Sequence, residues 1–427
     1  MGSDDERHRL PPRVNRRTAA KLLGAGALAS AIPAPALAAD VGSNAAAILI
    51  LKTLLHANLL PFWRRICDQP AIEGYELNVD AIGQPLGPSI RRIIPQTRTT
   101  WFFAHLARSG RGRPRDLEIA AHGFRYLTEH MWDYTHGGFF PGVDPQKDHQ
   151  PIEDTRKLLV EQAHGLLALS EYALAVRARS ERDEARAWAV RMFEAIDTHL
   201  RDPATGDYRD ALARDWTGTP PPERAYPARF RLVDALTVYV ELEPSAAGRL
   251  AEAVALADRA LVEINGHVHT RSAEPPPATP SVAYLNDLQI VHQLRRARAA
   301  LGDAAPALPS LSYHRVLDDA LRWGEDHPAG GFFEAGSPGV PASNRRKVGF
   351  TQAEALLGLC DGWVRTRDLG HGAGFWRTLL WIARRQADWA NGDWYPTVLE
   401  GVPTNGPKGS PFHTGRSVLR SLELLEA

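Results

Sequence analysis

The sequence contains little that would support a disulfide framework, a metal-binding motif or a strongly charged surface. Its 427 residues include only two cysteines, Cys67 and Cys360, which lack the spacing of a metal site. Two isolated cysteines with apolar neighbours are usually buried small side chains. The sequence alone does not decide whether these two form a disulfide. Lysine and arginine total 50 residues, and so do aspartate and glutamate. This balance gives no electrostatic reason to expect nucleic acid or an acidic membrane surface as a partner.

The apolar run near the N-terminus, LLGAGALASAI, is too short for a stable membrane anchor. It follows the pair Arg16-Arg17, and Ala36-Leu37-Ala38 then supplies small residues suited to cleavage. We therefore interpret residues 1–39 as a twin-arginine-type signal peptide. The mature protein, residues 40–427, is predicted to be periplasmic or secreted, with no membrane association once the signal is removed. A disordered, arginine-bearing tail is the alternative interpretation.

Strand-like alternation is scarce, and apolar residues instead recur at spacings of three and four along most of the chain. Only two short stretches, 75–79 and 332–334, are plausible strands. Prolines cluster between the helical segments, and no linker divides the chain. The pattern predicts an all-α protein with one domain and twelve helices, over residues 45–67, 94–109, 115–132, 154–176, 181–200, 228–242, 246–264, 282–302, 312–326, 348–365, 371–390 and 411–426.

One pattern occurs twice in the chain. Gly137–Leu169 and Gly330–Leu359 both begin with Gly-Gly-Phe-Phe, pass through a polar loop containing proline, and end in Lys-x-x-x-x-Gln-Ala-x-x-Leu-Leu-x-Leu. This indicates a repeated unit of a glycine turn, a loop and an apolar helix. The equivalent lysines, Lys157 and Lys347, are separated by about half of the mature chain. In a closed ring of helical hairpins the two copies would lie on opposite sides of one cavity, with both loops on one rim and both lysines in structural roles.

Two further segments combine a histidine, arginines and aromatic residues. Gly409–Arg416 reads GSPFHTGR, and Gln96–Ala104 reads QTRTTWFFA. They resemble motifs of the N-acylglucosamine 2-epimerase family, which includes cellobiose 2-epimerases and mannose and sulfoquinovose isomerases. The first is similar to a family motif ending in Tyr-His-x-x-Arg, with Phe412 for the tyrosine. The resemblance extends over essentially the whole mature chain and implies an (α/α)6 barrel, or six-hairpin toroid, in agreement with the helix pattern.

The resemblance also implies a chemistry. In that family a histidine removes the proton from C2 of an open-chain sugar to give an enediol(ate), and a proton returned to C2 or C1 gives the epimer or the ketose. The resemblance assigns this role to His413 and implies that Arg98 stabilises the charge that develops on the carbonyl oxygen. It implies no cofactor and no metal. The residues expected to contact the sugar are Trp101, Arg231, Asn286, Glu354 and Arg416.

Two family histidines are absent from this chain. Asn286 and Arg231 occupy their positions, and neither an amide nor a permanently protonated guanidinium can act as a base at neutral pH. With His413 alone, aldose–ketose isomerisation is expected in preference to 2-epimerisation, because one base can move a proton between C2 and C1 along one face. His164 is a second candidate base, although a helix histidine with satisfied hydrogen bonds is the favoured interpretation.

Two other functions remain open. One is a catalytically silent relative that binds a saccharide in the periplasm. The other is a glycosidase or lyase on the same barrel, which would need paired inward carboxylates, with Asp154, Glu354 and Asp393 as candidates. His267 and His269 lack a third ligand, so they do not predict a metal site. The expected partner is a small-molecule sugar and not nucleic acid, and the protein is expected to be a monomer or homodimer.

Overall fold

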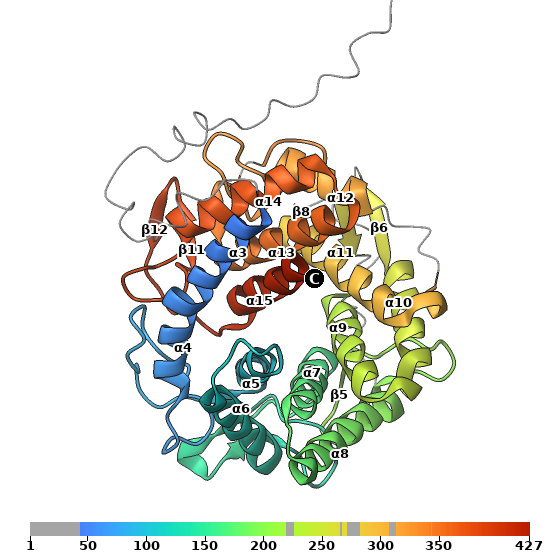
Figure 1. The fold of residues 1–427 in the computed structure, drawn as a ribbon. Helices are drawn as coiled ribbons and strands as arrows, with labels where there is room; N and C mark the ends of the chain where they lie inside the picture. Colours follow the sequence, from blue (N-terminus) through green and yellow to red (C-terminus); the bar gives the residue numbers. More distant parts are fainter. Residues whose placement is uncertain (1–42, 219–225, 265–266, 271–281, 307–312, 343) are drawn as a thin grey trace, which may run out of the picture.

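Helices dominate the computed structural model, which describes residues 43–218, 226–264, 267–270, 282–306, 313–342 and 344–427. The signal peptide predicted for residues 1–39 lies outside these ranges. The helices alternate between inner and outer positions of a ring (Figure 1). Each inner helix contacts the next, and the last contacts the first, so the ring is closed. The inner helices are α5 (Ile93–Arg108), α7 (Leu159–Ala175), α9 (Tyr226–Leu242), α11 (Tyr284–Leu301), α13 (Gly349–Thr366) and α15 (Phe412–Glu426).

The outer ring also contains six helices within the described ranges, and π-helical turns interrupt or extend most of them. Together with the inner ring they form the (α/α)6 barrel predicted from the sequence, and their bounds lie close to the predicted ranges. The outer helices are α3–η1–α4 (Asn44–Thr53, Leu54–Leu59, Leu60–Cys67), α6–η2 (Pro114–Tyr126, Leu127–Met131), α8–η4 (Arg179–Ala195, Ile196–Leu200), α10 (Ala247–Ala260), α12–η7 (Tyr313–Asp319, Ala320–Gly324) and α14–η8 (Leu369–Trp381, Ile382–Gln386).

Inner and outer helices differ in how much of their surface is buried. The inner helix α7 buries fifteen of its seventeen residues, whereas its outer neighbour α8 buries four of seventeen. A helix buried on all sides can carry polar residues only where they find partners or face a cavity. The polar residues of the inner helices therefore indicate where a site lies. Cys67 and Cys360 are both buried and unpaired in the core, so they form no disulfide.

The first outer helix, Asn44–Cys67, is long and apolar enough to cross a membrane by length and composition alone. However, 56% of its most apolar 18-residue window is buried inside the protein. Leu54, Leu59 and Trp63 are fully buried, and α3 contacts the inner helix α15. The helix thus belongs to the outer wall of the barrel.

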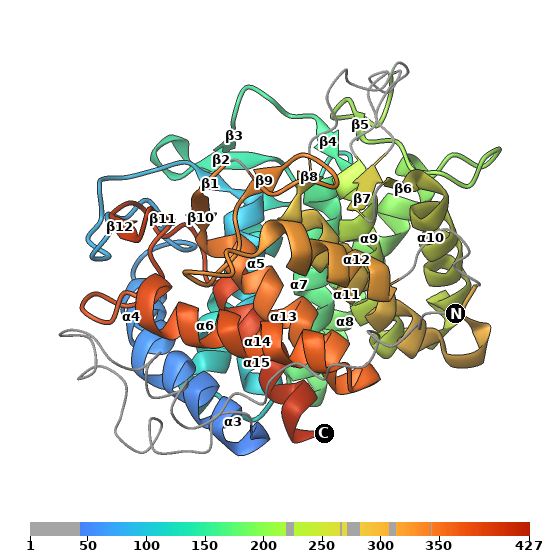
Figure 2. The ribbon, with the colours of Figure 1, turned by 90° about the horizontal axis from the view of Figure 1, so that it is seen from above.

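Short strands gather along one face of the barrel (Figure 2). Four of them directly precede the inner helices α5, α7, α11 and α13, so this face is the rim at which those helices begin. The strands are β1 (Arg91–Arg92), β2 (Gly142–Asp144), β3 (Gln150–Pro151), β4 (Lys157–Leu158), β5 (Ala211–Leu212), β6 (Leu261–Ile264), β7 (His267–Thr270), β8 (Val282–Ala283), β9 (Ala335–Gly336), β10 (Arg346–Val348), β11 (Thr397–Leu399) and β12 (Val402–Thr404).

The strands predicted at 75–79 and 332–334 were wrong, because Val79 and Phe332 take part only in isolated bridges. The helix predicted to run to residue 264 ends instead at Ala260, where β6 begins and pairs with β7.

The repeated unit has the structural role predicted for its lysines. Lys157 is fully buried and its Nζ lies 3.2 Å from an Asp133 carboxylate oxygen, while Lys347 Nζ lies 2.8 Å from Asp326. Each aspartate begins a turn closed by its carbonyl oxygen, which accepts from the N–H of the glycine four residues later. The helices that follow the two lysines, α7 and α13, are separated by two inner helices in either direction around the ring. The two copies therefore lie across the ring from each other, on one rim.

Replacing Asp326 with asparagine is expected to destabilise the fold by about 3–5 kcal/mol, because it leaves the buried Lys347 ammonium without a counter-charge. Burial already lowers the Lys347 pKa, although Asp326 opposes this effect. Urea unfolding of the variant measures the loss. The double variant Asp326→Asn/Lys347→Met removes both charges and should recover part of the lost stability. A single variant as stable as the parent protein would contradict a stabilising role for this pair.

Close packing between inner helices depends on Gly358 of α13. A Cβ at this position would lie 2.9 Å from the Leu288 carbonyl oxygen of α11, and backbone cannot move aside as a side-chain tip can. We expect Gly358→Ala to cost about 1–3 kcal/mol of unfolding free energy. Gly248 of α10 is the matched control, since a Cβ there meets nothing within 4 Å. Gly248→Ala should be neutral or stabilise by up to about 1 kcal/mol. Equal effects of the two substitutions on the melting temperature would contradict this account.

Candidate active site

Polar residues occupy the same position on five inner helices. Five residues after the first residue of each helix, α5, α7, α9, α11 and α13 carry Arg98, His164, Arg231, Gln289 and Glu354. Because inner helices share one orientation in an alternating ring, residues at equal register lie at similar depth. The N-terminal ends of these helices also carry partial positive charge, which favours an anion or a developing negative charge at this rim.

His413 and Glu354 form the centre of the site. Nδ1 of His413, in the first turn of α15, lies 2.8 Å from Oε1 of Glu354 on α13. Since an ionised carboxylate can only accept, Nδ1 carries the proton and Nε2 is left with a free lone pair. The His413 side chain keeps 20% of its surface exposed, whereas Glu354 keeps 1%. The arrangement presents the Nε2 of a neutral imidazole and holds its other nitrogen in place.

The pKa values of this pair fit that protonation state. Burial by itself would raise the pKa of Glu354, but Arg416 and His413 outweigh burial and lower the pKa to about 2. Burial lowers the pKa of His413 to about 4, with help from Arg98, although the hydrogen bond with Glu354 opposes the shift. At neutral pH the carboxylate is therefore charged and the imidazole is neutral.

A second carboxylate, Asp234, connects the site to three arginines. Arg416 Nη2 donates to Glu354 at 2.5 Å, and its Nη1 donates to Asp234 at 3.1 Å. Asp234 also accepts from Arg231 at 2.9 Å and from Arg296 at 3.3 Å. The charges of both carboxylates are thus compensated before any ligand arrives. The network fixes α9, α11, α13 and α15 relative to one another.

Arg98 differs from the other arginines of the site. Within the described part of the chain it makes no hydrogen bond or ion pair, and its Nε is buried without a partner. Burial lowers the Arg98 pKa to about 9, and the charges of Arg231 and Arg416 act in the same direction. Its guanidinium lies 5.0 Å from the centre of the Phe412 ring, and those of Arg231 and Arg416 lie 5.2 and 4.8 Å from it. Arg98 is therefore free to bind a ligand oxygen.

The structure brings together His413, Arg98, Arg231, Glu354 and Arg416, five of the seven residues proposed from the sequence. His413 and Arg98 both border Phe412, whose ring centre lies 5.4 Å from that of His413. Their proximity is compatible with one small ligand between them.

The other two proposed residues do not join this cluster. Asn286 lies partly buried in the first turn of α11, and among the described residues no hydrogen bond joins it to His413 or Arg98. Trp101 is only 2% exposed and stacks on His105, with Phe412 at its edge. The expectation that Trp101 contacts the sugar is therefore corrected, because the side chain is buried by protein.

The sequence-based prediction gave too little importance to two residues near the site. Asp234 accepts from several arginines and was not proposed, although its place three residues after Arg231 puts it on the same helix face. His164 is 2% exposed, and its Nδ1 is buried without a partner. Its ring centre lies 5.8 Å from that of Phe412, and burial lowers its pKa well below the usual value. The expectation of satisfied hydrogen bonds for His164 was wrong.

The carboxylates that a glycosidase would need do not form a pair. Asp154 binds Arg156 in an exposed loop, and Glu354 is held by His413 and Arg416. Asp393 is buried, and burial raises its pKa to about 7. No two of these three share a partner in the described residues.

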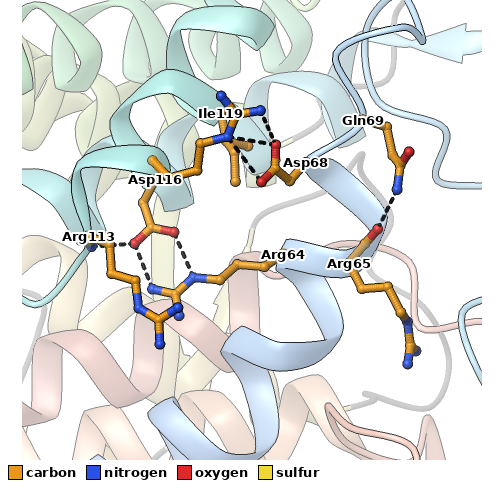
Figure 3. A pocket seen from close by; sticks show the side chains of 8 residues that line it. Arg64, Arg65, Asp68, Gln69, Arg113, Asp116 and Ile119 are labelled. Carbon is orange, nitrogen blue, oxygen red and sulfur yellow. Dashed lines mark hydrogen bonds and ion pairs between the residues drawn. The ribbon is translucent and has the colours of Figure 1, made fainter.

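A separate cavity of about 390 Å³ lies between α4 and α6, in the outer ring (Figure 3). It is lined by four arginines and two aspartates, and each aspartate pairs with one of the arginines. Arg64 donates two hydrogen bonds to Asp116, each 2.7 Å long, and Arg115 pairs with Asp68 at 2.6 Å. This cavity contains none of the residues proposed from the sequence.

Comparisons with known proteins agree with the motifs. The sequence profile of N-acylglucosamine 2-epimerase (GlcNAc 2-epimerase) matches residues 74–274. A cellobiose 2-epimerase from Bacteroides fragilis is 28% identical over 163 residues, which cover 38% of this chain and 39% of that relative. The aligned region thus spans about two fifths of the curated relative's length.

Two solved structures share the fold over nearly their whole length. The cellobiose 2-epimerase of Spirochaeta thermophila superposes with a TM-score of 0.77 at 23% identity, covering 90% of this chain and 97% of that one. A D-mannose isomerase superposes with a TM-score of 0.72 at 18% identity, covering 90% and 99%. The two structures show a shared fold, and the profile match, the curated relative and the shared motifs together support membership of the N-acylglucosamine 2-epimerase family.

Proposed function

We propose that the protein is a carbohydrate epimerase or isomerase that transfers the C2 proton of an open-chain aldose. The observation that carries the proposal is the hydrogen bond from His413 Nδ1 to Glu354, which leaves Nε2 as a free base beside the unpartnered Arg98. The relatives that are a cellobiose 2-epimerase and a D-mannose isomerase support a sugar as the substrate class.

The proposed reaction uses these residues in order. Nε2 of His413 takes the C2 proton, and the imidazolium that forms is stabilised by the Glu354 carboxylate. Arg98 compensates the negative charge that develops on the former carbonyl oxygen as the enediolate forms. Return of the proton to C1, with a hydroxyl proton moving from O2 to O1, gives the ketose. Return to the opposite face of C2 gives the epimer.

We further propose that aldose–ketose isomerisation is the favoured outcome. One accessible base can deliver a proton to C1 or C2 from the same side, whereas epimerisation needs a donor on the other face. Arg231 and Asn286 replace family histidines. Neither a guanidinium nor an amide gives up a proton at neutral pH, so neither can protonate that face.

Incubation of the protein with a panel of aldoses in deuterium oxide tests the function. Loss of the C2–H signal in proton NMR spectra is expected for at least one sugar, with ketose formed faster than epimer. Binding without exchange across the panel would overturn the enzymatic proposal in favour of a silent saccharide-binding protein.

The rate is expected to depend on pH through His413. Its unprotonated form is the base, and its pKa is lowered to about 4 by burial. The kcat/KM for exchange should therefore be nearly constant from about pH 5 to neutrality and fall about tenfold per unit below about pH 4. Stopped or continuous assays across this range measure the profile. A single inflection near 6.5, the ordinary value for histidine, would contradict a buried and neutral base.

We also propose that the protein is exported, on the basis of the sequence of residues 1–39. Replacement of Arg16 and Arg17 by lysine should leave the precursor in the cytoplasm, as judged by fractionation. Unchanged export of that variant would contradict a twin-arginine route.

A further inference from the structure

A second group of ligating side chains lies on the rim, outside the candidate active site. Glu73, His130 and His149 each offer one ligand atom, and these atoms all lie within 4.8 Å of one another. Two imidazole nitrogens and one carboxylate oxygen are a donor set that zinc uses in proteins, with water in the fourth position. We propose that these three residues form a zinc site that fastens the rim of the barrel.

The three residues come from separate segments that the fold brings together. Glu73 belongs to the loop between α4 and β1, His130 to the π-helical turn η2, and His149 to the turn just before β3. Nε2 of His149 lies 2.7 Å from Oε2 of Glu73, and the rings of His130 and His149 stack with centres 4.0 Å apart. Convergence of two histidines and a glutamate from three segments is the arrangement that a metal ion would hold together.

The backbone and a neighbouring tyrosine hold His149 in a suitable orientation. Asp148 and His149 both have left-handed backbone conformations, with φ of 52° and 54°, which are uncommon for residues that carry a Cβ. The Tyr126 hydroxyl lies 3.1 Å from Nδ1 of His149. In the structure Nε2 donates to the Glu73 carboxylate, so zinc would displace that proton. With Nδ1 then donating to the Tyr126 hydroxyl, Nε2 would have the lone pair that a metal needs. Metal-bound histidines commonly have such a partner on the second nitrogen.

The surroundings leave one side of the site open. The Glu73 side chain is 64% exposed, so solvent can supply a further ligand. A divalent cation would join the two imidazoles and the carboxylate in one coordination sphere.

The location suggests what the metal does. The loop that carries Glu73 leads to β1, which pairs with β2, and β2 pairs with β3 directly after His149. Arg91 of β1 also donates to the Glu73 carbonyl oxygen at 3.3 Å. Since β1 precedes α5, which carries Arg98, zinc would fix the rim strands at the start of that helix. The proposed role is structural and does not rest on the proposed sugar chemistry.

Calorimetric titration of the tag-free, full-length protein with zinc chloride tests the site. One zinc ion per chain is expected at this site. His149→Ala and His130→Ala should abolish that binding event, and Tyr126→Phe should weaken it by about 10–100-fold. Zinc should raise the melting temperature of the parent protein and not that of the His149→Ala variant. Cobalt in place of zinc should give visible absorption bands that also require His149.

His122→Ala is the matched control. His122 lies on the same helix as His130, but its Nε2 bonds to the Gly74 carbonyl oxygen at 3.0 Å, and it is not one of the three ligands. Its variant should keep the parent affinity for zinc within about twofold. Glu73→Gln provides a second test at an exposed position where folding is not at risk. Absence of zinc binding, or equal binding by the parent, His149→Ala and Glu73→Gln proteins, would overturn the proposal and leave a histidine–glutamate ion pair.

Discussion

Replacement of His413 by alanine is expected to lower the rate of C2–H exchange by about 10²–10⁴-fold, the usual contribution of a general base. The side chain is the one imidazole of the cluster that keeps substantial exposure, and Glu354 orients it. Because Arg98 and Arg416 remain in place, sugar binding should change by only a few-fold. Exchange measured by NMR, together with binding measured by calorimetry, separates the two effects.

His164→Leu is the control for that prediction. His164 lies near the same phenylalanine but is 2% exposed, so it should not reach a substrate. Its replacement is expected to leave exchange within a few-fold of the parent rate. If His164→Leu abolished exchange and His413→Ala did not, the base would have to be reassigned.

Glu354→Gln should also lower exchange strongly, by about 10²-fold or more and up to about 10⁴-fold. The amide has nearly the same shape, but it carries no charge to stabilise the imidazolium, and its NH2 group can bind the wrong tautomer of His413. Arg416 retains Asp234 as a partner, so the fold should survive the change. Melting curves and exchange rates measured on the same preparation show whether activity falls more than stability does.

Asp234→Asn is the matched comparison for Glu354→Gln. It removes a charge from the same network, but Asp234 contacts arginines and not His413. We expect it to reduce stability more than Glu354→Gln does and to reduce exchange less. The opposite ranking of the two variants would show that Glu354 acts through the network as a whole and not through the histidine.

Much of the barrel could be predicted from the sequence because its helices are long and strongly periodic. The repeated lysines also indicated a ring, and Lys157 and Lys347 pair with equivalent aspartates. Strands of two to four residues have too little sequence to show a period, so they were missed or misplaced. A third lysine pair, between Lys408 and Asp388 at 3.0 Å, escaped notice because its loop lacks the Gly-Gly-Phe-Phe start.

The candidate site was harder to predict than the fold, for a physical reason. Inner helices are buried on all sides, so periodicity does not distinguish the face toward the central axis from the face toward the outer ring. Trp101 and Arg98 are three residues apart on α5, yet Trp101 is covered by His105 and Phe412 while Arg98 keeps unpaired donors. Only the three-dimensional arrangement identifies Asp234 as the shared acceptor.

The closure of the ring has a consequence for how the protein is made. The helix that carries His413, α15, follows every other helix in the chain, yet it contacts α3, α5 and α13. Asn58, near the start of the barrel, likewise donates to the Asp388 carbonyl oxygen, 330 residues away. Before α15 is synthesised, the inner ring cannot close and His413 is missing. The inner helices of such a nascent chain expose apolar surface. Chaperone protection until synthesis is complete would therefore serve this fold, and catalysis should begin only once the last hairpin has docked.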